Sequence, residues 1–109
     1  MRRLVLEDTP ERQQAFRLRL PGCMVVSTYS QAVAALSLLR FGEVYLDFDI
    51  EFGHNGADVA SYMVRQMPVW RRPALVVVHS SNRGGGMAIQ QILRWGLFSQ
   101  VERRPFPPW

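Results

Sequence analysis

Short apolar runs alternate with longer stretches of helical periodicity along this 109-residue chain. The apolar runs are continuous rather than alternating, which is typical of strands covered by helices on both faces. We therefore expect five strands, at 4–6, 24–26, 44–46 and 74–78 and near Val101.

Between the strands, apolar residues recur at the i, i+3, i+4, i+7 spacing of one helix face. The three groups are Ala32/Ala35/Leu36/Leu39, Ala60/Met63/Val64/Met67 and Ile89/Ile92/Leu93/Gly96. Thr9 followed by Pro10 predicts a further helix start, because threonine caps helices and proline suits their first position. Ser30 is the candidate cap of the second helix. Met63 and Met67 are expected to fill the core.

Four strand–helix units followed by a last strand predict an α/β fold. Right-handed crossovers turn this order into an open parallel sheet with helices on both faces, a three-layer architecture. We expect the strand order 2-1-3-4-5. The Pro/aromatic tail at 105–109 cannot continue as a helix. The chain is thus expected to be a single domain over 1–109 with the final helix missing.

Composition narrows the class of protein. Hydrophobic residues make up 48% and charged residues 20%, which excludes a disordered or collagen-like chain. Cys23 is alone, so a disulfide-stapled secreted module is excluded. The apolar run at 74–78 is far short of a membrane span, and the run at 4–6 is too short for a signal peptide. We expect a cytoplasmic protein without membrane contact.

All thirteen basic residues are arginines, and the net charge is +4. The absence of lysine is most simply explained by a GC-rich coding sequence, although arginine also suits bidentate contact with phosphate. The arginines are scattered, with no run dense enough for a nucleic-acid-binding tail. Charge alone is compatible with a phosphate-bearing ligand but does not require one.

Acidic side chains follow the first and third predicted strands: Glu7 and Asp8, then Asp47 and Asp49, with Glu51 shortly after. In doubly wound sheets, ligands bind beyond the carboxyl ends of strands where the strand order reverses. Carboxylates gathered there repel one another unless a cation neutralises them, and hard oxygen ligands suit Mg²⁺ or Mn²⁺. The alternative is that Glu7 and Asp8 are solvated acids of a loop or first helical turn. The four acids together favour a metal site.

The segment after the fourth strand combines polar side chains with three glycines, at 79–82 and 84–86. Glycines ahead of a helix would leave backbone N–H groups open to an anion. His79 is suited to transfer a proton near neutral pH. The alternatives are a flexible glycine loop and a buried, hydrogen-bonded histidine. A Walker loop is excluded because its lysine is absent, and neither His79 nor His54 forms a zinc site with the lone cysteine.

At these residues the chain resembles the receiver domains of two-component signalling, which have a flavodoxin-like fold. The matched features are Glu7 and Asp8, Asp47 or Asp49, Ser80, the turn at 55–58, and Arg104-Pro105-Phe106. The resemblance implies Mg²⁺ binding and phosphoryl transfer to the aspartate after the third strand. The departures are arginine at 104 instead of lysine, His79 before the hydroxyl, and the missing final helix.

The chain resembles more closely the cyclic-phosphate-processing receiver-like family. That family carries an acidic end to the first strand, Asp-His-Asp after the third, a Gly-x-Asp turn, and His-Ser-x-Asn-Pro-x-Gly after the fourth. The corresponding segments here are 6–8, 47–49, 56–58 and 79–85. Phe48 replaces the motif histidine, which removes one acid or base, and Arg83 replaces the motif proline. The resemblance implies a ligand with a cyclic phosphate, on a nucleotide or an RNA end.

The predicted site residues fall into three groups. The expected metal ligands for Mg²⁺ or Mn²⁺ are Glu7, Asp8, Asp47 and Asp49. The expected catalytic residues are His79, Ser80 and Asp47. The expected phosphate-binding residues are Asn82, Gly84, Gly85 and Arg104.

Three function classes remain open. The first is a metal-dependent phosphoesterase-like enzyme or a binder of such a phosphate ligand. The second is a stand-alone receiver-like regulatory module. His79 and the three glycines favour the first class over the second, because a receiver does not need them to accept a phosphoryl group. The third is a small interaction protein anchored by Trp70, Trp95 or the tail residues Phe106 and Trp109. The alternative for these aromatic residues is ordinary packing.

Overall fold

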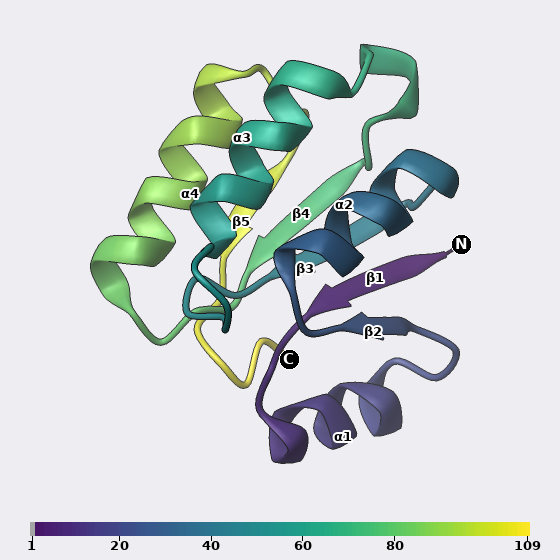
Figure 1. Ribbon diagram of the computed structural model, residues 1–109, viewed down its shortest axis with the longest axis vertical. Helices are drawn as coiled ribbons and strands as arrows, with labels where there is room; N and C mark the ends of the chain where they lie inside the picture. Colours follow the sequence, from purple (N-terminus) through teal and green to yellow (C-terminus); the bar gives the residue numbers. More distant parts are fainter. Residues whose placement is uncertain (1) are drawn as a thin grey trace.

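The computed structural model describes residues 2–109. The strands are β1 (Arg3–Leu6), β2 (Met24–Val26), β3 (Glu43–Leu46), β4 (Leu75–Val78) and β5 (Val101–Arg103). The helices are α1 (Pro10–Arg19), α2 (Tyr29–Leu38), α3 (Gly56–Gln66) and α4 (Arg83–Trp95), with a 3₁₀ helix η1 (Val69–Arg71). All strands are parallel, in the order β2-β1-β3-β4-β5 (Figure 1). The predicted α/β fold and strand order are confirmed, and within the described residues no helix follows β5.

The strand register places the carboxyl ends of β1, β3 and β4 in one row. Leu6 pairs with Leu46, and Leu46 pairs with Val78. The next residues of the three segments are therefore neighbours across the sheet. This alignment determines which polar side chains meet at the edge.

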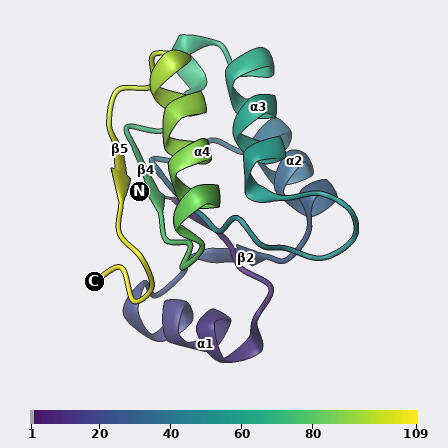
Figure 2. The ribbon, with the colours of Figure 1, turned by 90° about the vertical axis from the view of Figure 1, so that its left-hand side faces the viewer.

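The helices are distributed unequally over the two faces of the sheet. Helices α2, α3 and α4 cover one face, and α1 covers the other together with the C-terminal tail (Figures 1 and 2). Because successive side chains of a strand point to opposite faces, Leu4 and Val5 belong to different apolar clusters. Because both faces of the sheet are covered, successive residues of each strand are buried, which explains the continuous apolar runs in the sequence.

The C-terminal tail packs against α1, at the side of the sheet where no final helix is present. The ring of Phe16, which is fully buried, has its centroid 5.9 Å from that of Phe106 and 5.2 Å from that of Trp109. The Phe106 backbone N–H donates to the His79 carbonyl at 2.9 Å. The tail thus covers part of the face that α1 leaves open.

Two arginines of the η1 region stabilise the carboxyl ends of three helices. Arg71 donates to the carbonyl of Leu36 in α2, and Arg72 donates to those of Val64 in α3 and Gly96 after α4. A cation at a helix C-terminus also interacts favourably with the helix dipole. This arginine pair is therefore explained by packing of the helix ends.

Side-chain caps begin three of the helices, at Thr28, Asn55 and Asn82. The expectation that Ser30 caps the second helix is wrong: the cap is Thr28, two residues earlier, and its Oγ1 accepts from the Gln31 backbone N–H at 3.1 Å. At α3, Asn55 and Asp58 form a reciprocal capping box. No helix in residues 2–109 is long and apolar enough to cross a membrane.

Gly56 begins α3 directly against the backbone of the site. A Cβ there would lie 1.8 Å from the Asp47 carbonyl oxygen. We predict that Gly56→Ala lowers the free energy of unfolding by about 2–3 kcal/mol, because the backbone must move to relieve the overlap. Gly84→Ala is the matched control, since its Cβ would meet only Asn82, at 3.8 Å. This control should be neutral or stabilising by up to about 1 kcal/mol in a helix. Urea unfolding of both variants tests the prediction, and an unchanged midpoint for Gly56→Ala would contradict it.

Candidate functional site

A pocket of about 390 Å³ lies beyond the carboxyl ends of β1 and β3. Its lining consists of Asp8, Thr9, Arg12, Asp47, Asp49, Ile50, Glu51, Ser81 and Asn82, and we call it the carboxylate pocket. The strand order reverses between β1 and β3, which is where ligands are expected in such sheets. The structure therefore brings together three of the four predicted metal ligands, namely Asp8, Asp47 and Asp49.

Arg12, in the first turns of α1, adds a positive charge to this acidic pocket. Its Nη2 donates to Ser81 Oγ at 3.3 Å, and its guanidinium lies 4.7 Å from the centre of the Phe106 ring. A guanidinium is suited to hold phosphate oxygens. Sequence reasoning missed Arg12, because no local motif distinguishes it among thirteen arginines. Only its position one turn after the acids of the first strand could have indicated it.

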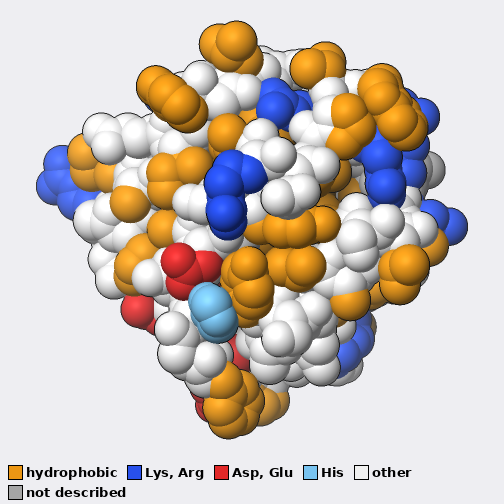
Figure 3. Space-filling model, turned by 45° about the horizontal axis from the view of Figure 1, so that its top comes forward, with side chains coloured by type: hydrophobic (Ala, Val, Ile, Leu, Met, Phe, Trp, Pro, Cys, Tyr) orange, Lys and Arg blue, Asp and Glu red, His pale blue; other side chains and the backbone are white. Residues whose placement is uncertain are grey.

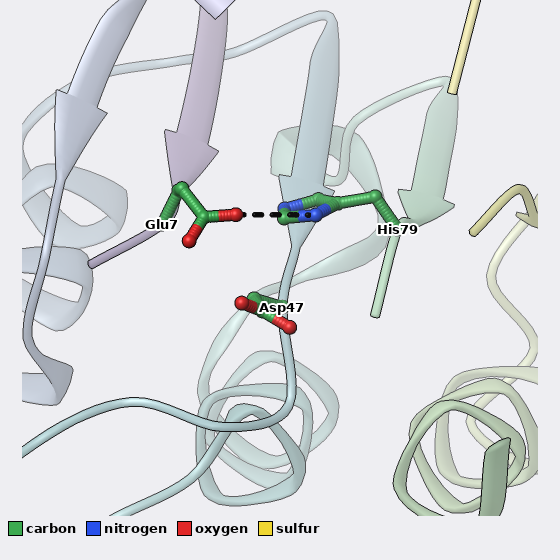
Figure 4. A group of neighbouring side chains, drawn as sticks. All are labelled: Glu7, Asp47 and His79. Atoms are coloured by element: carbon green, nitrogen blue, oxygen red, sulfur yellow. Dashed lines mark ion pairs between the residues drawn. The ribbon is translucent and has the colours of Figure 1, made fainter. Parts of the chain in front are cut away.

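Glu7, the fourth predicted ligand, lies beneath the pocket and faces His79 (Figure 4). Both side chains are 0% exposed, and Glu7 Oε1 lies 3.7 Å from His79 Nδ1. Neither of these two atoms has a hydrogen-bond partner. His79 Nε2 lies 3.1 Å from the Leu6 carbonyl oxygen. Since a carbonyl only accepts, Nε2 carries the proton, and the Nδ1 lone pair faces Glu7.

Burial controls the protonation of this pair. It raises the pKa of the Glu7 carboxyl to about 7, and the nearby charge of Asp47 adds to the rise. It lowers the pKa of His79 to about 4. His79 is therefore neutral near pH 7. Because it is buried and does not line the pocket, it is not placed to exchange a proton directly with a ligand there.

Asp47 connects the buried pair to the carboxylate pocket. Its side chain is 5% exposed, and its Oδ1 accepts from the Phe48 backbone N–H at 2.8 Å. Burial raises the pKa of this carboxyl. One ligand atom from each of Glu7, Asp47 and His79 lies within 4.8 Å of the others (Figure 4). Two carboxylates and an imidazole are a donor set that divalent metals accept, and two of the atoms lack any other partner.

Ser80 and Asn82 join β4 to α4. Ser80 is buried, and its Oγ accepts from the Asn82 backbone N–H at 3.1 Å. The Asn82 side chain caps the helix by accepting from the Gly85 N–H at 2.9 Å, and its Nδ2 lies 3.4 Å from Asp49 Oδ2. Asn82 therefore lies in the pocket wall, whereas Ser80 lies behind it.

The expectation of a glycine loop ahead of the fourth helix is wrong. Helix α4 begins at Arg83, so the three glycines form part of its first turns. Asn82 occupies the N–H groups of Gly85 and Gly86, which are thus unavailable to an anion. Gly85 instead makes room for Phe48, because a Cβ there would lie 2.2 Å from that ring. Gly84 is exposed on the helix surface.

Arg104 and the three tryptophans lie outside the carboxylate pocket. Arg104 Nε donates to Glu102 Oε1 at 2.9 Å, and its phosphate-binding role remains a prediction. Trp70 and Trp95 are 69% and 82% exposed, so they do not serve core packing. Trp109 belongs to the tail that packs against α1.

The sequence model of the cyclic-phosphate processing receiver domain family matches residues 2–95. The chain belongs to this family. The family resemblance found in the motifs is thereby confirmed. No curated protein sequence is significantly similar to this receiver domain.

Solved response regulators have the same fold as this receiver domain. The phosphorylated cyanobacterial phytochrome response regulator RcpA is 16% identical, with a TM-score of 0.72 over 96% of this chain and 81% of that chain. The Thermotoga maritima response regulator TrrA, solved in complex with Mg²⁺ and BeF, is 16% identical, with a TM-score of 0.69 over 96% and 87%. The response regulator domain of T. maritima CheB is 19% identical, with a TM-score of 0.63 over 97% and 79%.

The raised pKa of Glu7 predicts a pH dependence of stability. The pKa of this carboxyl is 4.5 in the unfolded chain and about 7 in the folded protein, so between these pH values only the folded state binds the proton. The stability of the metal-free protein therefore falls as the pH rises from about 4.5 to about 7 through this group. Glu7→Gln mimics the neutral carboxyl and removes this contribution. Above pH 7 we predict that the variant is more stable than the parent by about 1–3 kcal/mol.

Urea unfolding in EDTA at pH 5 and pH 8 measures this effect. The His79 contribution, which weakens the fold as the pH falls below about 6.5, is common to both proteins. A constant difference in stability between parent and variant at the two pH values would contradict the prediction.

Proposed function

We propose that this receiver domain binds a phosphate-bearing ligand through a divalent cation in the carboxylate pocket. The observation that carries this proposal is the placement of Asp8, Asp47 and Asp49 beside Arg12 in one pocket. Carboxylates alone would repel a phosphate. A cation between carboxylates and phosphate removes the repulsion, and the guanidinium binds the remaining oxygens.

The chemical class of the ligand follows from the family. Membership of the cyclic-phosphate processing receivers supports a cyclic phosphate, carried by a nucleotide or an RNA end. The TrrA structure, described as a complex with Mg²⁺ and BeF, supports a divalent cation in this fold. We assign Mg²⁺ or Mn²⁺ to the carboxylate pocket.

We assign each pocket residue a separate role in the opening of a cyclic phosphate. Asp8, Asp47 and Asp49 would hold the cation, which would supply Lewis-acid polarisation of the phosphoryl group. Arg12 orients the phosphate and neutralises developing charge. In hydrolysis, a water oxygen would bond to phosphorus, one ring P–O bond would break, and the departing ring oxygen would take up the proton that the water gives up. Glu51, the remaining carboxylate of the lining, is our candidate to accept that proton from the water and return it to the departing oxygen.

Calorimetric titration with Mg²⁺ and adenosine 2′,3′-cyclic phosphate tests the proposal. The parent should bind the nucleotide only when Mg²⁺ is present. Asp8→Asn should weaken both metal and nucleotide binding. Arg12→Gln should retain Mg²⁺ but bind the nucleotide about 10- to 100-fold more weakly, because a charge-assisted hydrogen bond is lost.

Arg65→Gln is the matched control, since Arg65 lies on α3 and does not line the pocket. Its nucleotide affinity should equal that of the parent. Nucleotide binding of equal strength with and without Mg²⁺, or no binding by the parent, would overturn the proposal. Conversion of the bound cyclic nucleotide to adenosine 2′- or 3′-monophosphate distinguishes processing from binding alone.

A second candidate function, docking of a protein partner, is favoured by a groove between α3 and α4. The groove has a volume of about 660 Å³ and is lined by Ser61, Val64, Arg65, Gln91, Ile92 and Trp95. From 59 to 101 the sequence contains five arginines and no acidic residue. In Figure 3 apolar side chains extend over most of the face, arginine side chains lie mainly in its upper half, and the acidic side chains lie left of the centre and below it. This charge favours an acidic amphipathic helix as the partner.

A designed acidic peptide helix with a leucine stripe tests the second candidate, with tryptophan fluorescence as the readout. The peptide should bind the parent, and Trp95→Ala should weaken binding about tenfold or more. Asp8→Asn changes the carboxylate pocket and not the groove, so this variant should bind the peptide as the parent does. Equal binding of a lysine-rich peptide with the same leucine pattern, or an unaffected Trp95→Ala variant, would refute an acidic partner.

A further inference from the structure

We propose that His79 is a metal ligand and that Glu7, Asp47 and His79 form an inner site for a transition-metal cation with affinity for imidazole. This inference deepens the proposed function and rests on it, because the inner site shares Asp47 with the carboxylate pocket. It assigns the cation class as Mn²⁺, Co²⁺ or Zn²⁺ in preference to Mg²⁺.

Backbone groups hold one atom of each ligand, and the other atom of Glu7 and of His79 has no hydrogen-bond partner. His79 Nε2 is held by the Leu6 carbonyl oxygen, which leaves Nδ1. Glu7 Oε2 accepts from the Thr9 N–H at 3.0 Å, which leaves Oε1. Asp47 Oδ1 accepts from the Phe48 N–H, and the Ser80 hydroxyl also interacts with this carboxylate. Metal-binding histidines and carboxylates are typically oriented by such hydrogen bonds from their non-ligating atoms.

The distance between Glu7 Oε1 and His79 Nδ1 distinguishes a metal from a shared proton. At 3.7 Å the two atoms are too far apart for an O–H···N hydrogen bond, which requires about 3 Å or less. Two ligands of one cation, each about 2.0–2.2 Å from it, are separated by about 3–4 Å. Both atoms are fully buried without a partner, a costly state that a bound cation would relieve.

The imidazole nitrogen determines which cation fits best. Mg²⁺ prefers oxygen ligands and retains its waters, whereas imidazole suits zinc and its transition-metal neighbours. His79 is neutral near pH 7, as a metal-binding imidazole must be. Asp47 lies in both the inner cluster and the pocket lining, so a cation bound here would border the ligand pocket.

Pulsed EPR of the Mn²⁺-loaded parent tests the assignment without any substitution. A directly bound histidine gives a nitrogen modulation, which ¹⁵N-labelling of histidine should change. Mn²⁺ should also bind at least tenfold more tightly than Mg²⁺ in a calorimetric titration. His79→Gln should abolish the modulation and reduce the Mn²⁺ affinity to that for Mg²⁺, with Mg²⁺ binding unchanged.

His54→Gln is the matched control, because His54 is the second histidine and lies exposed beside Asp58. It should retain the nitrogen modulation and the preference for Mn²⁺. Mn²⁺ binding without nitrogen modulation in the parent would overturn the role of His79 and leave the carboxylate pocket intact. No binding of either cation by the parent would overturn both the inner site and the proposed function.

Discussion

The parallel alignment of β1, β3 and β4 is the constraint on which the site depends. Because these strands end in one row, the side chains that follow them must meet at a single edge of the sheet. Glu7, Asp47 and His79 occupy this row and are covered by the chain around them. The fold therefore forces ionisable groups into contact at a depth where isolated charges are unfavourable. Protonation of Glu7 or a bound cation are two ways to relieve that cost, and they compete.

The molecule separates its charges between two regions. Five of the nine acids lie beyond the strand ends of β1 and β3, whereas 59–101, which includes most of α3 and all of α4, contains arginine as the sole charged residue type. Part of this arginine content is structural, since Arg71 and Arg72 bind the ends of three helices. The exposed Trp95 and the groove beside it have no comparable packing explanation. A ligand site and a docking surface can thus coexist without overlapping.

Much of the fold could be predicted, because apolar runs and helical spacing report directly on burial. The positions of Asp8, Asp47 and Asp49 in the pocket could be predicted because each of them closely follows a predicted strand. The depth of His79 did not, since spacing shows which residue follows a strand but not whether a neighbouring element covers it. Arg12 was missed for a related reason: it lies on α1, and the sequence does not show that a side chain of this helix reaches the pocket beyond the strand ends.

The prediction for the glycines after β4 was wrong because the sequence does not show the contact between Gly85 and Phe48. Sequence suggested an open anion loop, but Gly85 is small because the Phe48 ring lies where its side chain would be. Phe48 stands where the family motif has histidine, so an apolar ring has replaced an acid–base group in contact with α4. Phe48 and Gly85 are sterically complementary, because a larger residue at 85 would overlap the Phe48 ring. Position 48 therefore offers no acid or base, while His79, fixed by the Leu6 carbonyl, retains a buried lone pair without a partner.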